Sequence, residues 1–80
     1  MKKVYKTKGT CSEAIEVVTD NDIIESVRFA GGCPGNLLAI GELVKGKNVD
    51  ETIDRLEGIK CGNKNTSCAD QLAQALKSMK

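Results

Sequence analysis

The residues best able to do chemistry in this chain are its four cysteines, Cys11, Cys33, Cys61 and Cys68. The sequence has no histidine, so histidine-based metal sites and Cys-His or Ser-His catalytic arrangements are excluded. If the thiols come together, they can bind a metal ion, hold an iron–sulfur cluster or act as a redox pair. Their spacings are neither the short paired ones of zinc fingers nor the clustered ones of ferredoxins, so the three chemistries stay open.

The sequence around each cysteine separates a chemical role from simple packing. Cys33 lies directly before a predicted helix, and Cys68 lies in the first turn of another. The positive end of a helix dipole lowers the pKa of a nearby thiol and so favours the thiolate that binds metals or attacks disulfides. We interpret Cys11, Cys33 and Cys68 as functional rather than as small apolar residues that fill space. For Cys61 the two interpretations are evenly balanced.

Length and composition predict one small domain, residues 1–80, with a thin core. Apolar residues make up 40% of the chain, and Tyr5 and Phe29 are its aromatic residues. Domains below roughly 70–80 residues commonly need a disulfide, a metal or a partner subunit for stability. The charged start, Met-Lys-Lys, predicts no signal peptide and therefore a cytoplasmic location, where reducing conditions disfavour structural disulfides. These arguments favour a metal.

Charge points to no particular partner. Twelve Lys and Arg residues against eleven Asp and Glu residues give a net charge of +1, and no basic stripe is interleaved with aromatics. We therefore expect no nucleic-acid binding. The longest apolar run, residues 37–40, is too short to span a membrane. Lysines at positions 2, 3, 6 and 8 are typical of an edge strand protected against aggregation.

The first part of the chain predicts strands. Residues 14–19 and 23–30 are rich in Val and Ile, and Asp-Asn-Asp at 20–22 predicts the turn of a hairpin. Residues 4–8 add a third strand. Ile15 and Val17 share one face of the hairpin, as do Val27 and Phe29.

The second part predicts three helices. The first begins at Pro34 and ends before Gly46. The second is capped by Asn48, with Glu51 in the capping box, and stops at Gly58. Ser67 caps the third, with Asp at position 70 completing the same signature. The fold class is therefore α+β, a small antiparallel sheet followed by helices on one face. Nine residues should form the core: Ile15, Val17, Val27, Phe29, Leu37, Ile40, Val44, Leu72 and Leu76.

Antiparallel alternation predicts where the cysteines lie. The loop after the first strand and the end of the third strand share one end of the sheet, which places Cys11 near Cys33. A second helix that brings the chain back can return Cys61 and Cys68 to that end. We therefore expect the four sulfurs to converge on one metal site.

Two motifs resemble a known family. Residues 66–70, Thr-Ser-Cys-Ala-Asp, resemble the signature of the TSCPD domain family, with alanine where the name has proline. Residues 32–36, Gly-Cys-Pro-Gly-Asn, resemble its other conspicuous motif, and the match covers essentially the whole chain. The family occurs as small free-standing proteins and as a C-terminal module of adenosylcobalamin-dependent ribonucleotide reductases. The resemblance implies a link to ribonucleotide reduction, in a chain too short to reduce nucleotides alone.

A more distant similarity is to the IscU/NifU-type iron–sulfur scaffold proteins, and it implies an IscU-like topology. The three scaffold cysteines match Cys11, Cys33 and Cys68, and Glu13 stands where an acidic residue follows the first of them. Ser67 replaces the scaffolds' usual histidine, and Cys61 is an addition.

Three functions follow from these residues and resemblances. The first is a noncatalytic zinc module, with all four cysteines as ligands, whose partner is a ribonucleotide reductase or a thiol-redox protein. The second is an iron–sulfur scaffold or carrier. The third is a thiol protein that relays electrons to a reductase. A homo-oligomer remains open in each case.

Overall fold

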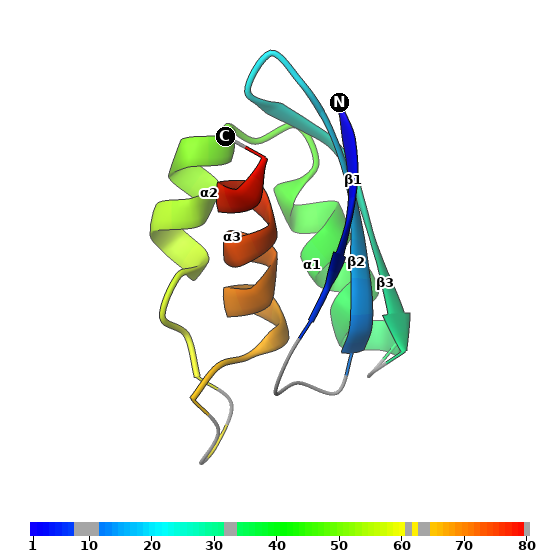
Figure 1. Ribbon diagram of the computed structural model, residues 1–80, viewed down its shortest axis with the longest axis vertical. Coiled ribbons are helices and arrows are strands. Elements are labelled where there is room, and N and C mark those ends of the chain that lie inside the picture. The colour runs from blue at the N-terminus through cyan, green and yellow to red at the C-terminus, as the bar shows by residue number, and fades with distance from the viewer. Residues whose placement is uncertain (8–11, 32–33, 61, 63–64, 80) are drawn as a thin grey trace.

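Three antiparallel strands precede three helices in the computed structural model, which describes residues 1–7, 12–31, 34–60, 62 and 65–79. The elements are β1 (Lys2–Lys6), β2 (Ser12–Asp20), β3 (Ile23–Gly31), α1 (Pro34–Val44), α2 (Val49–Leu56) and α3 (Cys68–Ser78). The strand order is β1-β2-β3, and the helices lie on one face of the sheet (Figure 1). The predicted α+β class is confirmed. No described helix is long and apolar enough to cross a membrane.

A tight turn at Asn21 and Asp22 joins β2 to β3. Both residues have positive φ, 50° and 70°, as a two-residue hairpin turn requires, and Asn and Asp tolerate that conformation. The turn sets a register in which Val17 pairs with Val27. The buried faces of the two strands therefore coincide, as the alternation of Val and Ile predicts.

An irregularity near this turn adds Ile24 to the core. Val18 pairs with Ser26, whereas the next residue, Thr19, pairs with Ile24, so β3 holds one extra residue there. Such a bulge reverses the alternation of side chains beyond it. Ile24 is fully buried as a result, although it lies three residues before the inward-facing Val27.

The first strand begins two residues earlier than the predicted strand at residues 4–8. Lys2 pairs with Val18 and Lys6 with Ala14, so β1 runs beside most of β2. Tyr5 lies opposite Ile15 and packs against the core, whereas Val4 is exposed. Strand pairing with β2, rather than local sequence, sets these bounds.

The helix ends follow the predicted caps. Asn48 Oδ1 accepts a hydrogen bond from the Glu51 backbone N–H at 3.1 Å, which fixes the start of α2. Gly46 and Gly58 follow α1 and α2 with φ of 82° and 85°, a conformation that only glycine adopts without strain. The Gly46 N–H also donates to the Ile24 carbonyl at 2.7 Å and so ties the α1–α2 connection to β3.

Each helix packs mainly against one or two other elements. α1 packs on β3, α3 packs on β2, and α2 packs on α3. All nine predicted core residues are buried or partly buried. Six are buried, namely Ile15, Val17, Leu37, Val44, Leu72 and Leu76, and three are partly buried, namely Val27, Phe29 and Ile40.

Gly41 sets the distance between α1 and β3. A Cβ atom at this position would lie 3.0 Å from the Val27 carbonyl oxygen, a backbone atom that has little room to move. The helix can approach the strand closely because glycine has no side chain.

We expect Gly41→Leu to push α1 away from β3 and to lower the free energy of unfolding by roughly 1–3 kcal/mol, the usual cost of overpacking. Gly35→Leu is the matched control, because Gly35 lies in the same helix and no atom of the described residues lies within 4 Å of its Cβ position. Urea unfolding followed by circular dichroism measures both variants. Equal stability of the two would show that the close approach is not a packing constraint.

Candidate functional site

The segments next to Cys11, Cys33 and Cys68 in the sequence lie at one end of the molecule. β2 begins there, β3 ends there, and α1 and α3 both begin there (Figure 1). In the sheet, Ser12 pairs with Gly31. Ser12 follows Cys11 in the sequence, and Gly31 comes two residues before Cys33. The chain neighbours of both cysteines therefore lie together, as the antiparallel argument predicts.

The predicted metal site extends beyond the part of the chain that the structure describes. Cys11, Cys33 and Cys61 lie outside the described residues, so the expected convergence of four sulfurs stays a prediction. Within the described ranges, no three acidic or cysteine side chains form a group that could hold a metal ion. Glu13 is exposed, at the point where the β2–β3 register shifts.

Cys68 is the predicted ligand that the structure describes. It is half-buried and is the first residue of α3, as the capping signature predicts. Ser67 caps the helix, since its Oγ accepts a hydrogen bond from the Asp70 N–H at 3.0 Å. The Ser67 carbonyl accepts from the Gln71 N–H at 2.8 Å, so the first turn of α3 is well formed. Cys68 thus lies at a helix start whose cap is hydrogen-bonded.

The side-chain carboxylate of Asp70, two residues after Cys68 in the sequence, accepts two hydrogen bonds. Its Oδ1 accepts from the Gly58 N–H at 2.8 Å, and its Oδ2 accepts from the Thr66 hydroxyl. The same Thr66 oxygen accepts from Gln71 Nε2 at 3.0 Å. Asp70 is only 8% exposed, so these bonds replace the water that its charge has lost. A single buried carboxylate therefore ties the end of α2 to the start of α3.

This environment holds the pKa of Asp70 below its usual value of 3.8. The hydrogen bond from Thr66 makes the largest contribution to that lowering, and the bond from the Gly58 N–H comes next. Burial of the charge acts in the opposite direction. Because the lowering prevails, Asp70 is ionised at neutral pH and its oxygens act as acceptors.

The sequence reveals only part of what Asp70 does. The spacing of Ser67 and Asp70 predicts the helix cap, which the structure confirms. The bond to Gly58, twelve residues earlier, has no counterpart in local spacing. Only the packing of α2 against α3 brings these residues together.

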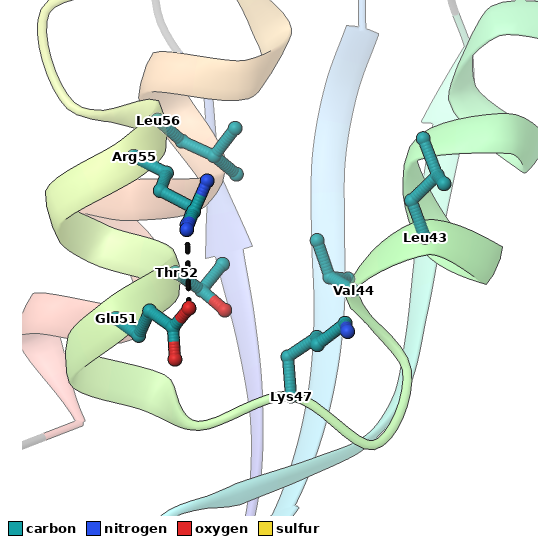
Figure 2. Close-up of a pocket in the computed structure, with 7 residues that line it drawn as sticks. All are labelled: Leu43, Val44, Lys47, Glu51, Thr52, Arg55 and Leu56. Atoms are coloured by element: carbon teal, nitrogen blue, oxygen red, sulfur yellow. Dashed lines mark hydrogen bonds and ion pairs between the residues drawn. The ribbon is translucent and has the colours of Figure 1, made fainter.

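A groove lies between α1 and α2, away from the start of α1. Figure 2 shows Leu43 and Val44 on one side and Leu56 on the other, with Lys47 at the connection between the helices. Leu43 is 72% exposed at its rim. The groove adjoins the last residues of α1, whereas Cys33 precedes its first residue, so the groove is separate from the predicted cysteine site.

Comparison with known proteins identifies a family. A family model described as the TSCPD domain matches residues 2–80, which include all four cysteines and both motifs. No curated protein and no solved structure matches the chain. The similarity to iron–sulfur scaffold proteins is not shown by these comparisons.

The lowered pKa of Asp70 gives a prediction for acid stability. The stabilisation from its ionised form should be fully present above the unfolded-state pKa of about 3.8 and should disappear as the pH falls through the lower folded-state value. Asp70→Asn should reduce the free energy of unfolding at neutral pH by about 1.5–3 kcal/mol, the range for hydrogen bonds to charged groups. The free energy of unfolding of this variant should also fall less than that of the wild type as the pH is lowered into the acid range.

Asp54→Asn is the matched control, since Asp54 is an exposed residue of α2 and the change removes the same charge. Urea unfolding from neutral to acid pH gives the profiles of both variants. If the Asp70 and Asp54 variants lose stability along the same curve, the buried bonds are not the source of the acid sensitivity.

Proposed function

The chain belongs to the TSCPD domain family, and from this membership and its cysteines we propose that it is a noncatalytic metal-binding module associated with ribonucleotide reduction. The proposed ion is zinc, and the proposed ligands are Cys11, Cys33, Cys61 and Cys68. Four thiolates in tetrahedral arrangement make a closed zinc site of the structural kind. Such a site needs no histidine, in agreement with the composition.

One observation carries the proposal. Ser12 and Gly31, the described chain neighbours of Cys11 and Cys33, are paired in the sheet, and α3 begins with Cys68 at the same end of the molecule. Three segments far apart in the sequence thus bring cysteine-flanking residues to one region. A start of α3 at the opposite end would have removed the basis for a shared site.

The proposed site also suits the energetics of a small chain. Folding of a domain of this size leaves little surplus free energy, and metal binding adds its own free energy to that of folding. Four thiolates with zinc carry a net charge of −2, and Lys60, next to Cys61 in the sequence, supplies an opposite charge. Zinc would therefore link the segments that carry the four cysteines and add to the stability that the small apolar core provides.

The family supplies the proposed partner. TSCPD domains occur as C-terminal modules of adenosylcobalamin-dependent ribonucleotide reductases. This occurrence supports such a reductase, or a thiol protein that supplies it with electrons, as the partner of this chain. The role that we propose for these 80 residues is an accessory one.

A second candidate function is an iron–sulfur scaffold or carrier that uses Cys11, Cys33 and Cys68. The observation that favours it is the sheet-first order of the fold, with a cysteine at the start of the last helix. A site of three thiolates would leave a coordination position open for an incoming ligand. The metal content distinguishes this candidate from a closed zinc site.

Elemental analysis of protein purified without oxygen should find about one zinc per chain, the content of a single four-cysteine site. Cys68→Ser should lower that content sharply. Iron with acid-labile sulfide and a brown colour would favour the scaffold instead. A metal-free protein with reactive thiols would overturn both metal functions and leave the electron relay.

Removal of the metal should destabilise the protein. A chelator should lower the melting temperature by more than the 4–8 °C that a loss of about 1 kcal/mol causes in a domain of 60–100 residues. Cys33→Ser should lower it similarly, and the chelator should then have little additional effect. Differential scanning calorimetry measures all four conditions. An unchanged melting temperature after chelation would show that the thiols do not stabilise the fold through a metal.

A further inference from the structure

We propose that two copies of this chain associate around a two-fold axis, through the exposed side of α1 and the groove between α1 and α2. The association surface consists of Glu42, Leu43, Lys47 and Leu56. Its central contact is Leu43 of each copy in the groove of the other. None of these residues belongs to the predicted cysteine site, so the association is separate from the proposed metal-binding function.

The first argument is the composition of α1. One side of this helix packs on β3. Glu42 is the one charged residue among its eleven, whereas α2 has four charged residues among eight. Leu38 and Leu43 are nevertheless 70% and 72% exposed. A helix that is apolar on all sides is normally buried on all sides, so we expect another surface to cover part of α1.

The groove indicates which part of α1 is covered. Leu43, Val44 and Leu56 give the groove its apolar lining, and Leu38 does not line it (Figure 2). Leu43 therefore combines a highly exposed side chain with an apolar hollow directly beside it. A two-fold pair uses the same patch on both copies, and a projection next to a hollow meets that requirement. Rotation about an axis near Leu43 places each projection in the hollow of the other copy.

The charges of this surface are also self-complementary. Glu51 and Arg55 on the α2 side pair with each other, with Arg55 Nε 3.3 Å from Glu51 Oε1. Lys47 and Glu42 are exposed, and neither forms an ion pair within the described part of the chain. A two-fold axis near the end of α1 makes the two helices antiparallel. Glu42 of each copy, before Leu43, then lies level with the chain after α1 in the other copy, where Lys47 is found.

Other properties of the chain favour a second copy as the occupant. Its net charge is only +1, so two copies repel each other weakly. Domains of this size commonly draw stability from a partner subunit, a metal or a disulfide. The edge of β1 is a poorer place for self-association, because pairing of two such strands would bring Lys2, Lys3 and Lys6 of both copies together. One helix side and one groove make a small interface, so we expect weak dimers.

The test is sedimentation equilibrium in the presence of a reductant, so that no disulfide joins the copies. The mass should rise from 8.6 kDa towards twice that value between roughly 1 µM and 1 mM protein. Leu43→Glu should weaken dimerisation by roughly tenfold or more, because it brings a charge into the apolar groove. Leu38→Glu is the matched control, since Leu38 has the same type, helix and exposure but does not line the groove, and it should dimerise as the wild type does.

Charge reversal tests the two-fold arrangement itself. Glu42→Lys and Lys47→Glu should each weaken dimerisation, and the double variant should restore it, because opposite charges face each other again. Circular dichroism checks that every variant is folded. A wild type that stays monomeric at 1 mM would overturn the proposal and leave a different protein as the occupant of the groove. Equal effects of Leu43→Glu and Leu38→Glu, or no rescue by the double variant, would overturn this surface even where dimers form.

Discussion

The register of the β2–β3 hairpin is the constraint on which the rest of the structure depends. It places Ile15 and Val17 on the helix-facing side, fully buried, so that α1 and α3 can pack on the sheet and α2 on α3. The same register pairs Ser12 with Gly31 at the far end of the hairpin. A slip by one residue would turn the apolar face to solvent and separate these neighbours of Cys11 and Cys33. Core formation and the layout of the candidate site thus have one cause.

The α2–α3 junction depends on a different interaction, a buried carboxylate. Removal of a charge from water is unfavourable unless hydrogen bonds replace the lost hydration. At Asp70 two donors from separate segments do so, and the lowered pKa shows that the bonds outweigh the burial. The apolar core holds α2 and α3 face to face, whereas this carboxylate links Gly58, after the end of α2, to Thr66, before the start of α3. An apolar residue at position 70 would leave the Gly58 N–H without that acceptor.

Local sequence rules predicted those features of the fold that local forces decide. The turn at residues 20–22, the caps at Asn48 and Ser67 and the glycine stop at Gly58 each depend on a few adjacent residues, and each is observed. The burial of Ile24 escaped prediction because it follows from a bulge, which depends on the partner strand. The bounds of β1 were set by pairing for the same reason.

The same distinction between local and long-range interactions applies to the candidate site. The position of Cys68 at a helix start could be predicted from the capping residue just before it. The second role of Asp70 could not, because the donor at Gly58 reaches it only through the packing of two helices. A signature read along the sequence gives the types of residue present. It does not give the distant partner that each side chain finds in the fold.

The alanine at position 69 can be understood from the helix geometry of the signature. Ser67 is the N-cap of α3, so Ala69 is the second residue of the helix, where a backbone N–H has no carbonyl acceptor one turn earlier. Proline lacks that N–H, which explains why the first turn of a helix accepts it. Alanine at the same position brings the N–H back, and no hydrogen bond within the helix is lost. Alanine also has the highest helix propensity. The bonds of Thr66, Ser67 and Asp70 use other atoms and are independent of position 69. Alanine in place of proline at position 69 therefore leaves intact both the hydrogen bonds of the Asp70 carboxylate and the start of α3, where Cys68 lies.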